Sequence, residues 1–351
     1  MSNLRILRYL PHYLRRKFDQ KIIVIESDDW GLERVLGNSS FDFLKNKFGA
    51  EKFSRWTLDA LETKEDLDML FDLMESYKNK SLHAPVITAN FITHNIDYSS
   101  ESELKFIPVS EGFNRGSEDV REIYKTGIEK RFIFPQLHGY SHYNLSELNK
   151  YFYTDEAKEF FANGFLTGRS TIKGNMKFLQ GEMSQENKDV RIKESCDEFF
   201  RMFGFKPDTV IPPTYILDRE ASEKLKQCGI TMLQSSNRLL NSDGGRYTVP
   251  YFRKRKGFVW SVRNARLDPH EDYNFNSDQC IADIGKAFNN KLPAVIDFHR
   301  VNISGKYAPA YREKTLSELK KLFDNIYDQW PDVKFLNSSE LNKIIWQQET
   351  R

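Results

Sequence analysis

Two histidines four positions apart, His138 and His142, are the most chemically suggestive pair in the sequence. Only 7 histidines occur among 351 residues, and this pair directly follows an apolar run typical of a strand. Spacing of i, i+4 places both imidazoles on one face of a helical turn, which is ligand spacing for a first-row metal ion. A chance H-x-x-x-H is the alternative, and it is uncommon among so few histidines. The pattern favours a metal site at the end of this strand.

Paired carboxylates and a late histidine follow two other apolar runs. Asp28 and Asp29 are adjacent, and like charges at a strand end persist together when a cation neutralises them or when they have different roles. Helix capping by aspartate is the competing explanation. Strand alternation puts Asp297 and His299 on the same side of a late run. A histidine beside a metal ion can act as an acid, whereas a satisfied core histidine is the plainer reading.

Further side chains lie where the substrate would be expected. Consecutive prolines stiffen the segment 212–215. Basic residues after the sixth run suit either an anionic substrate or a surface salt bridge. The residues that we expect to contact substrate are Trp30, Pro213, Tyr215, Arg263 and Asn264, and a backbone N–H near Tyr215 is a candidate oxyanion donor.

Eight short apolar runs separated by helical patterns must position these residues. The runs cover residues 21–27, 85–92, 131–137, 208–212, 230–236, 257–263, 292–298 and 333–336. Such alternation predicts a parallel sheet, and this many units in one chain favour a closed or nearly closed barrel over two domains. In such barrels the functional groups gather at the carboxyl ends of the strands, which is where the candidate residues fall.

Composition narrows the class of protein. Lys+Arg number 52 and Asp+Glu 50, so no large basic field supports nucleic-acid binding. The 3 cysteines form no C-x-x-C pair, which favours a reducing, cytoplasmic location. We expect residues 1–20 to form a basic arm, packed on the protein or resting peripherally on a membrane. The barrel would span 21–351, with an insertion at about 145–186 that is either a lid or plain surface elaboration.

These motifs, in this order, resemble the polysaccharide deacetylase (NodB-homology) superfamily, akin to carbohydrate esterase family 4. The resemblance covers roughly residues 21–345 and rests on the double aspartate, the H-x-x-x-H pair, a proline-containing loop and the late histidine. It implies a distorted (β/α)7 barrel of the glycoside hydrolase/deacetylase type. It also implies Asp29, His138 and His142 as ligands of one divalent ion.

The same resemblance implies Asp28 as general base and His299 as general acid. Three features depart from the family pattern: Trp30 is inserted between the double aspartate and Gly31, the arginine expected in the proline-containing loop is missing, and the aspartate-rich fourth motif is not recognisable. The groups that orient Asp28 and His299 therefore cannot be named from the sequence.

The expected reaction is metal-dependent hydrolysis of an N- or O-acetyl group on a sugar or glycan precursor. Zinc is the expected ion, with cobalt, nickel, manganese or iron as alternatives. Two other functions compete. A metal-independent glycoside hydrolase would pair Asp28 with Asp268 or Glu271, and a non-catalytic glycan-binding relative would retain only the fold.

Overall fold

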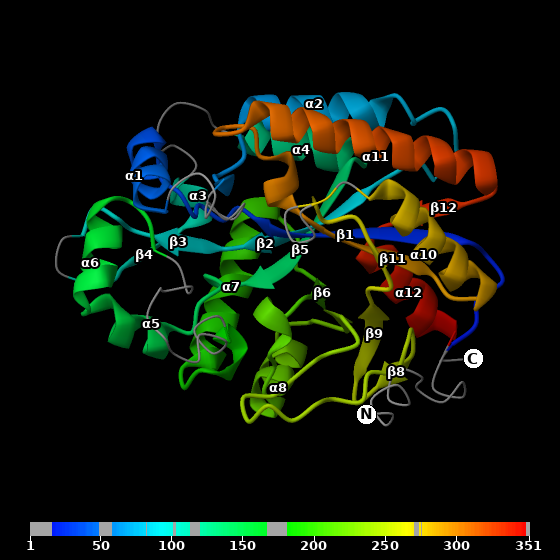
Figure 1. The fold of residues 1–351 in the computed structure, drawn as a ribbon. Helices are drawn as coiled ribbons and strands as arrows, with labels where there is room; N and C mark the ends of the chain where they lie inside the picture. Colours follow the sequence, from blue (N-terminus) through cyan, green and yellow to red (C-terminus); the bar gives the residue numbers. More distant parts are fainter. Residues whose placement is uncertain are drawn as a thin grey trace, which may run out of the picture.

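A sheet of mostly parallel strands surrounded by helices forms the centre of the molecule (Figure 1). The structure is a computed structural model that describes residues 16–48, 58–81, 83–100, 103–112, 120–166, 181–269, 274 and 276–348. The strand order is β10-β11-β1-β2-β5-β6-β7-β9-β8, and β12 pairs with β1. The strands of this sheet are β1 (Ile22–Trp30), β2 (Ile87–Ile92), β5 (Ile133–Gly139), β6 (Thr209–Val210), β7 (Met232–Ser235), β8 (Lys254–Arg255), β9 (Phe258–Val262), β10 (Ala265–Arg266), β11 (Ala294–His299) and β12 (Lys334–Leu336).

The sheet closes into a barrel between β9 and β10. β9 pairs with β7, whereas β10 pairs with β11 at the other edge of the sheet. In the short link between them, the Arg263 amide donates to the Ser235 carbonyl at 2.9 Å and the Asn264 amide donates to Val295 at 3.0 Å. The chain thus joins the two edges of the sheet. β9 and β10 together make the last of the seven parallel strands of the barrel, which are called staves below. The distorted (β/α)7 barrel expected from the sequence is confirmed.

Side chains along the strands point alternately into the barrel and outward. Along β1, the inward-pointing residues change from apolar near the amino end of the strand to acidic near its carboxyl end. On β1, Ile23 and Ile25 point outward into the main core, whereas Val24 joins an apolar layer inside the barrel. Two residues further, Glu26 accepts hydrogen bonds from Ser261 and from Ser338 inside the barrel. Strand periodicity of two therefore places Asp28 at the next interior level, near the mouth.

Helices cover the outside of the barrel and close its bottom. Figure 1 shows α2, α4 and α11 together on one side, and α7 and α8 on another. Leu341 and Ile345 of α12 pack against the interior apolar layer, so this helix plugs the amino-terminal end of the staves. The helices are α1 (Asn38–Phe48), α2 (Lys64–Glu75), α3 (Val109–Gly112), α4 (Arg121–Glu129), α5 (Leu145–Phe152), α6 (Asp155–Ala162), α7 (Lys188–Phe203), α8 (Arg219–Gln227), α10 (Ser277–Asn289), α11 (Pro309–Gln329) and α12 (Ser338–Gln348), with short 3-10 turns η6 (Glu182–Ser184), η7 (Pro213–Tyr215) and η8 (Arg300–Ile303).

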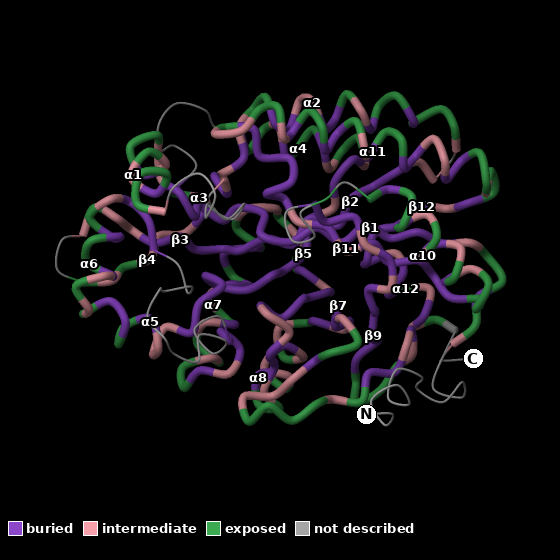
Figure 2. The backbone as a smooth tube through the Cα atoms, in the orientation of Figure 1, coloured by how far each residue is buried: buried purple, intermediate pink, exposed green. Residues whose placement is uncertain are grey.

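Local sequence signals set the ends of several helices. Thr63 caps α2 by accepting from the Asp66 amide at 3.1 Å, while the Asp66 carboxylate accepts from the Thr63 amide at 3.0 Å. α7 ends at Gly204, whose φ of 74° is a left-handed conformation that glycine adopts without strain. Figure 2 shows that the barrel strands are mostly buried, whereas the exposed residues lie on the outer faces of the helices, in loops and on the short edge strand β8.

The predicted insertion at 145–186 carries a small core of its own. Within the described residues, α5 and α6 pack together beside a two-stranded ribbon of β3 (His94–Ile96) and β4 (Phe106–Pro108). Leu148, Phe152 and Phe161 belong to this separate cluster. Residues 167–180 of the insertion lie outside the described part of the chain. The segment therefore builds a packed wall at one side of the barrel (Figure 1).

The predicted N-terminal arm is described only from residue 16 onward. There the Arg16 amide donates to the Tyr251 carbonyl at 3.2 Å, and the Phe18 amide donates to Lys291 at 2.7 Å. Residues 1–15, and with them the basic part that suggested membrane contact, lie outside the described residues. Among the helices that the structure describes, none has an apolar stretch long enough to span a bilayer.

Candidate metal centre

β1 ends in two consecutive carboxylates that both reach the barrel mouth. Regular alternation would send them to opposite faces of the sheet. Instead, the register of β1 against β2 shifts between Ser27 and Trp30, and Asp29 adopts a φ of 65°. A left-handed conformation of this kind costs a non-glycine residue about 1–3 kcal/mol and is found mainly at functional sites. The bulge turns Asp29 inward beside Asp28.

The two histidines meet through a loop and not through a helical turn, so the helical turn expected from their spacing is wrong. His138 lies near the end of β5, and His142 lies in the loop that follows. Glu182 shapes this loop: its carboxylate accepts hydrogen bonds from the amides of Tyr140, Ser141 and His142 at 2.6, 2.7 and 2.7 Å. His142 takes a φ of 71° within this cradle.

Gly139 allows the loop to approach Glu182 closely. Its φ is 134°, and a Cβ at this position would lie 2.5 Å from Glu182 Oε1. Only glycine therefore fits between His138 and the anchoring carboxylate.

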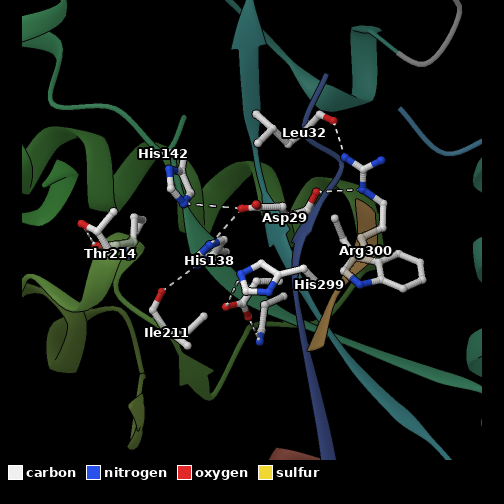
Figure 3. Close-up of polar contacts among 12 residues, drawn as sticks. Asp29, Leu32, His138, His142, Ile211, Thr214, His299 and Arg300 are labelled. Atoms are coloured by element: carbon white, nitrogen blue, oxygen red, sulfur yellow. Dashed lines mark hydrogen bonds and ion pairs between the residues drawn. The ribbon is translucent and has the colours of Figure 1, made fainter. Parts of the chain in front are cut away.

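Asp29, His138 and His142 converge into a buried triad with the spacing of metal ligands (Figure 3). Asp29 Oδ1 lies 3.2 Å from His138 Nε2 and 3.5 Å from His142 Nε2. Ligands of a tetrahedral ion with bonds of about 2.0–2.1 Å are separated by about 3.3 Å. Within the described part of the chain, neither carboxylate oxygen of Asp29 receives a hydrogen bond. One carboxylate and two imidazoles thus fit a divalent ion such as zinc.

Hydrogen bonding orients His138 for ligation. Its Nδ1–H donates to the Ile211 carbonyl at 3.0 Å, which directs Nε2 toward Asp29. Burial opposes a charge on His138, but Asp28 and Asp29 outweigh it and raise the pKa of this imidazole. Burial lowers the pKa of His142 to about 3, so this ring is neutral, as a metal ligand must be.

Two buried arginines, Arg34 and Arg300, contact Asp29. Arg34 Nη2 lies 3.5 Å from Asp29 Oδ2, and Arg34 Nε donates to Asp59 at 3.0 Å. Arg300 Nε donates to the Asp29 carbonyl at 3.0 Å, and its Nη2 contacts Asp59 (Figure 3). Burial tends to raise the pKa of Asp29, but His142, His138 and Arg34 lower it well below the usual range. Asp29 is therefore held as a carboxylate.

Arg263 holds Asp28 beside the triad. Its guanidinium donates to both oxygens of Asp28, at 2.6 and 2.8 Å, and Asn90 donates a third hydrogen bond at 2.9 Å. Burial tends to raise the pKa of Asp28, but Arg263 and His138 outweigh it and lower this pKa to about 2. Asp28 is therefore ionised and fixed in orientation, as a group that accepts a proton must be.

Asp268 holds His299 on the same side of the mouth. Asp268 Oδ2 accepts from His299 Nδ1 at 3.0 Å, and Asn302 donates to the other oxygen at 2.8 Å. His299 Nε2 lies 3.9 Å from Asp28 Oδ2. Burial alone would lower the pKa of His299, but Asp268 and Asp28 raise it to about 10. The imidazole is consequently protonated at neutral pH, with Nε2–H facing the site.

A second cluster of possible ligands, Asp268, Asp297 and His299, lies next to the triad. Two arginines already pair with the carboxylates of this cluster: Arg263 donates to Asp297 at 2.6 Å, and Arg266 donates to Asp268 at 3.2 Å. A cation here would have to displace both. Of the two clusters, the Asp29 triad is therefore the better candidate for a metal site.

Three residues expected to contact substrate have structural positions instead. Trp30 is 0% exposed and donates through Nε1 to Ser27 at 2.9 Å, because the β1 bulge returns it to the outer core. The guanidinium of Arg263 forms ion pairs with Asp28, Asp297 and Glu26. Asn264 donates to the Pro293 carbonyl at 2.9 Å and accepts from the Val295 amide at 2.8 Å, so it helps to close the barrel.

The amide of Tyr215 itself is not available as the oxyanion donor, and an N–H elsewhere near Tyr215 stays a prediction. The Tyr215 amide donates to the Pro212 carbonyl at 2.9 Å, so this N–H is already used. The Tyr215 hydroxyl accepts from Arg263 at 3.3 Å, which places the ring beside the Asp28 clamp. Pro213 is buried against Gly139. Substrate contact by Pro213 and Tyr215 stays a prediction.

Sequence inspection missed the residues that position the centre. Glu182 lies in the insertion, and Arg34 lies in a loop after β1, and neither belongs to a recognisable motif. From the sequence, Asp268 is named only as a possible partner of Asp28 in a glycosidase, and Asp297 only as lying on the same side of its strand as His299. The signal that could have identified Asp268 was its place as an acidic residue after a barrel strand, near the mouth of the barrel.

The sequence matches no protein-family model and no curated protein. Among solved structures, a mutant of the peptidoglycan deacetylase PdaC from Bacillus subtilis is 11% identical, with a TM-score of 0.43 over 95% of this chain and 95% of that chain. A 4-alpha-glucanotransferase from Thermococcus litoralis is 13% identical, with a TM-score of 0.48 over 93% of this chain but only 40% of its own. A CE4 family pseudoenzyme from Bacillus anthracis is 8% identical, with a TM-score of 0.40 over 92% of this chain and 66% of its own.

Proposed function

We propose that this protein is a divergent polysaccharide deacetylase that hydrolyses an acetyl group from an acetylated sugar or glycan precursor with one divalent ion. The observation that carries the proposal is the convergence of Asp29, His138 and His142 in a buried triad. An ionised carboxylate and a protonated imidazole lie on its flanks.

The triad would hold the ion through Asp29 and the Nε2 atoms of His138 and His142. When bound, a divalent ion of this kind polarises an acyl group and makes water a stronger acid near neutral pH. Three protein ligands are typical of catalytic zinc sites, which keep further positions open. Zinc is therefore the ion that we propose.

Asp28 would accept the proton from the attacking water. The clamp by Arg263 fixes the direction of the carboxylate, but it also makes Asp28 a weak base, with a pKa of about 2. Proton transfer from ordinary water to such a base is strongly unfavourable, and it becomes much less so where a bound cation has lowered the pKa of the water. A base of this kind thus depends on the cation beside it.

His299 would donate a proton to the departing amine or alkoxide. Asp268 keeps Nδ1 protonated and leaves Nε2–H, 3.9 Å from Asp28, directed toward the site. Because the pKa of His299 is about 10, the ring carries this proton across the neutral range. An imidazolium of this strength matches an amine leaving group, which gains a proton of similar acidity.

Two of the three residues that would serve a glycoside hydrolase, Asp28 and Asp268, already have other partners. Such an enzyme needs one protonated carboxyl group as acid. Asp28 is held ionised by Arg263, and Asp268 is bonded to His299. Glu271, the other candidate partner, lies outside the described residues. The geometry therefore supports acyl hydrolysis over glycosidic cleavage.

Acetate release from a panel of acetylated monosaccharides, oligosaccharides and nucleotide sugars, with and without added zinc, tests the proposal. We expect Asp28→Asn to lower the rate about 10²–10⁴-fold, the usual contribution of a general base, while the protein still binds zinc. His138→Ala should lose both zinc binding and activity, because a ligand is removed.

Full activity of Asp28→Asn would show that this carboxylate is not the base. Zinc binding without acetate release from any member of the panel would favour a non-catalytic relative. Metal-independent release of reducing sugar would favour a glycosidase.

A further inference from the structure

Two of the three cysteines contact each other on the outer surface, away from the triad. Cys196 lies on α7, and Cys228 is the residue that ends α8. Both cysteines line one cavity, and a side-chain hydrogen bond couples the Cys196 thiol to the sulfur of Cys228. The helices themselves are packed against each other. A disulfide here would join the end of α8 to the adjacent helix α7.

A small cavity gives solvent access to this pair. It has a volume of about 240 Å³, and both cysteines line it. Cys196 is only 8% exposed, whereas Cys228 is half-buried. A small solute would therefore reach Cys228 first, with Cys196 directly behind it.

Positive charge surrounds the exposed thiol. Lys193, Lys206 and Lys224 line the same cavity, against a single acidic residue, Asp197. The hydrogen bond from Cys196, with help from Lys224 and Lys193, outweighs burial and lowers the pKa of Cys228 to about 7. Cys196 has its pKa raised by the same contact and by burial. Cys228 is thus the nucleophile and Cys196 the thiol that follows it.

We propose that Cys196 and Cys228 form a modification site at which a hydroperoxide makes a reversible disulfide between α7 and α8. The Cys228 thiolate attacks the peroxide, breaks its O–O bond and becomes a sulfenic acid, and hydroxide leaves. Cys196 then attacks the Cys228 sulfur, the S–S bond forms and water leaves. In sum, two thiols and one hydrogen peroxide give one disulfide and two waters.

The disulfide would enclose a segment that reaches the barrel mouth. Residues 196–228 include β6 and the turn Pro213–Tyr215, which lies beside Gly139 and the Arg263 clamp. Closing this ring would restrict the segment in both folded and unfolded protein. The chemistry at the cysteines is independent of the proposed deacetylase activity.

The test uses the full-length, reduced protein exposed to one equivalent of hydrogen peroxide at pH 7. We expect intact mass spectrometry to show the loss of two hydrogen atoms, and peptide mapping to show Cys196 linked to Cys228. Cys280→Ser is the matched control: Cys280 is 0% exposed on α10, so its loss should leave the reaction unchanged.

Single variants separate the two roles. Cys196→Ser should stop at a sulfenic acid on Cys228 that dimedone captures, and Cys228→Ser should show neither product. Lys224→Gln should slow the first step several-fold, whereas Lys45→Gln on α1 should not. Absence of the disulfide, a link between two chains through Cys228, or a link that involves Cys280 would each overturn the proposal.

Discussion

The proton on His299 is held in place by one carboxylate, Asp268. That carboxylate accepts from Nδ1 at 3.0 Å and is itself fixed by Asn302. The pKa of His299 rises to about 10 because Asp268 and Asp28 outweigh the effect of burial. As pH rises through this value the acid loses its proton, so activity should fall on the alkaline side and not near neutrality.

We predict that Asp268→Asn moves the alkaline limb of the pH–rate profile to lower pH. The amide carries no charge to stabilise the imidazolium, and burial then lowers the pKa of His299. The measurement is kcat against pH for the two proteins, with zinc content determined in parallel. Asp278→Asn, an exposed change on α10, should leave the profile in place. An unmoved limb in Asp268→Asn would mean that His299 is not the acid.

At this scale the sequence predicts the reacting groups better than their partners. The side chains of Asp28, Asp29, His138, His142 and His299 all meet at one mouth because each lies at or just after the carboxyl end of a barrel strand, and these ends share an edge. Their partners come from contacts far apart in the chain: Arg263 is 235 residues from Asp28. No local pattern encodes such a contact, which is why Arg263 was assigned to substrate.

One buried carboxylate organises the loop that follows His138 and carries His142. Glu182 accepts three amide hydrogens from consecutive residues, and burial with these contacts fixes His142 in a left-handed conformation. Loop residues are free to adopt other conformations unless such an anchor is present. The element that makes H-x-x-x-H a ligand pair is therefore a loop with its anchor, and not a helix.

We predict that Glu182→Gln weakens zinc binding about 10–100-fold, the usual effect of removing a group that orients ligands. The amide nitrogen of glutamine would face backbone N–H groups in place of an acceptor oxygen, so the loop would open. Zinc titration with a competing chelator measures the affinity. Glu186→Gln is the control, because Glu186 is exposed four residues away. Equal affinities in both variants would leave Glu182 with a folding role alone.

At the scale of the whole molecule, the alternation of apolar runs and helical patterns predicts the barrel. All eight predicted runs are strands, and seven of them are the staves of the closed barrel. The way in which the barrel closes was not predictable. It depends on a two-residue break after Val262 and on amides that bond across to β7 and β11. Periodicity within a run carries no information about the partners of its edges.

The proposed ion links the site to the stability of the entire chain. Without it, two carboxylate oxygens of Asp29 are buried without hydrogen bonds among the described residues, and the Nε2 atoms of His138 and His142 face one of them. A ligand that binds only the folded state stabilises it by about 2.7 kcal/mol at 100 times its dissociation constant. For a chain of 351 residues this corresponds to a rise in Tm of about 4 °C.

We therefore predict that zinc raises the Tm of the metal-free protein by about 4 °C at this concentration, and that His138→Ala abolishes the rise. Differential scanning calorimetry with a zinc series measures both, and Asp28→Asn serves as the matched variant because it keeps all three ligands. An equal rise in His138→Ala would place the ion elsewhere. No rise in the unaltered protein would remove the cation on which Asp28, with its pKa of about 2, depends as a base.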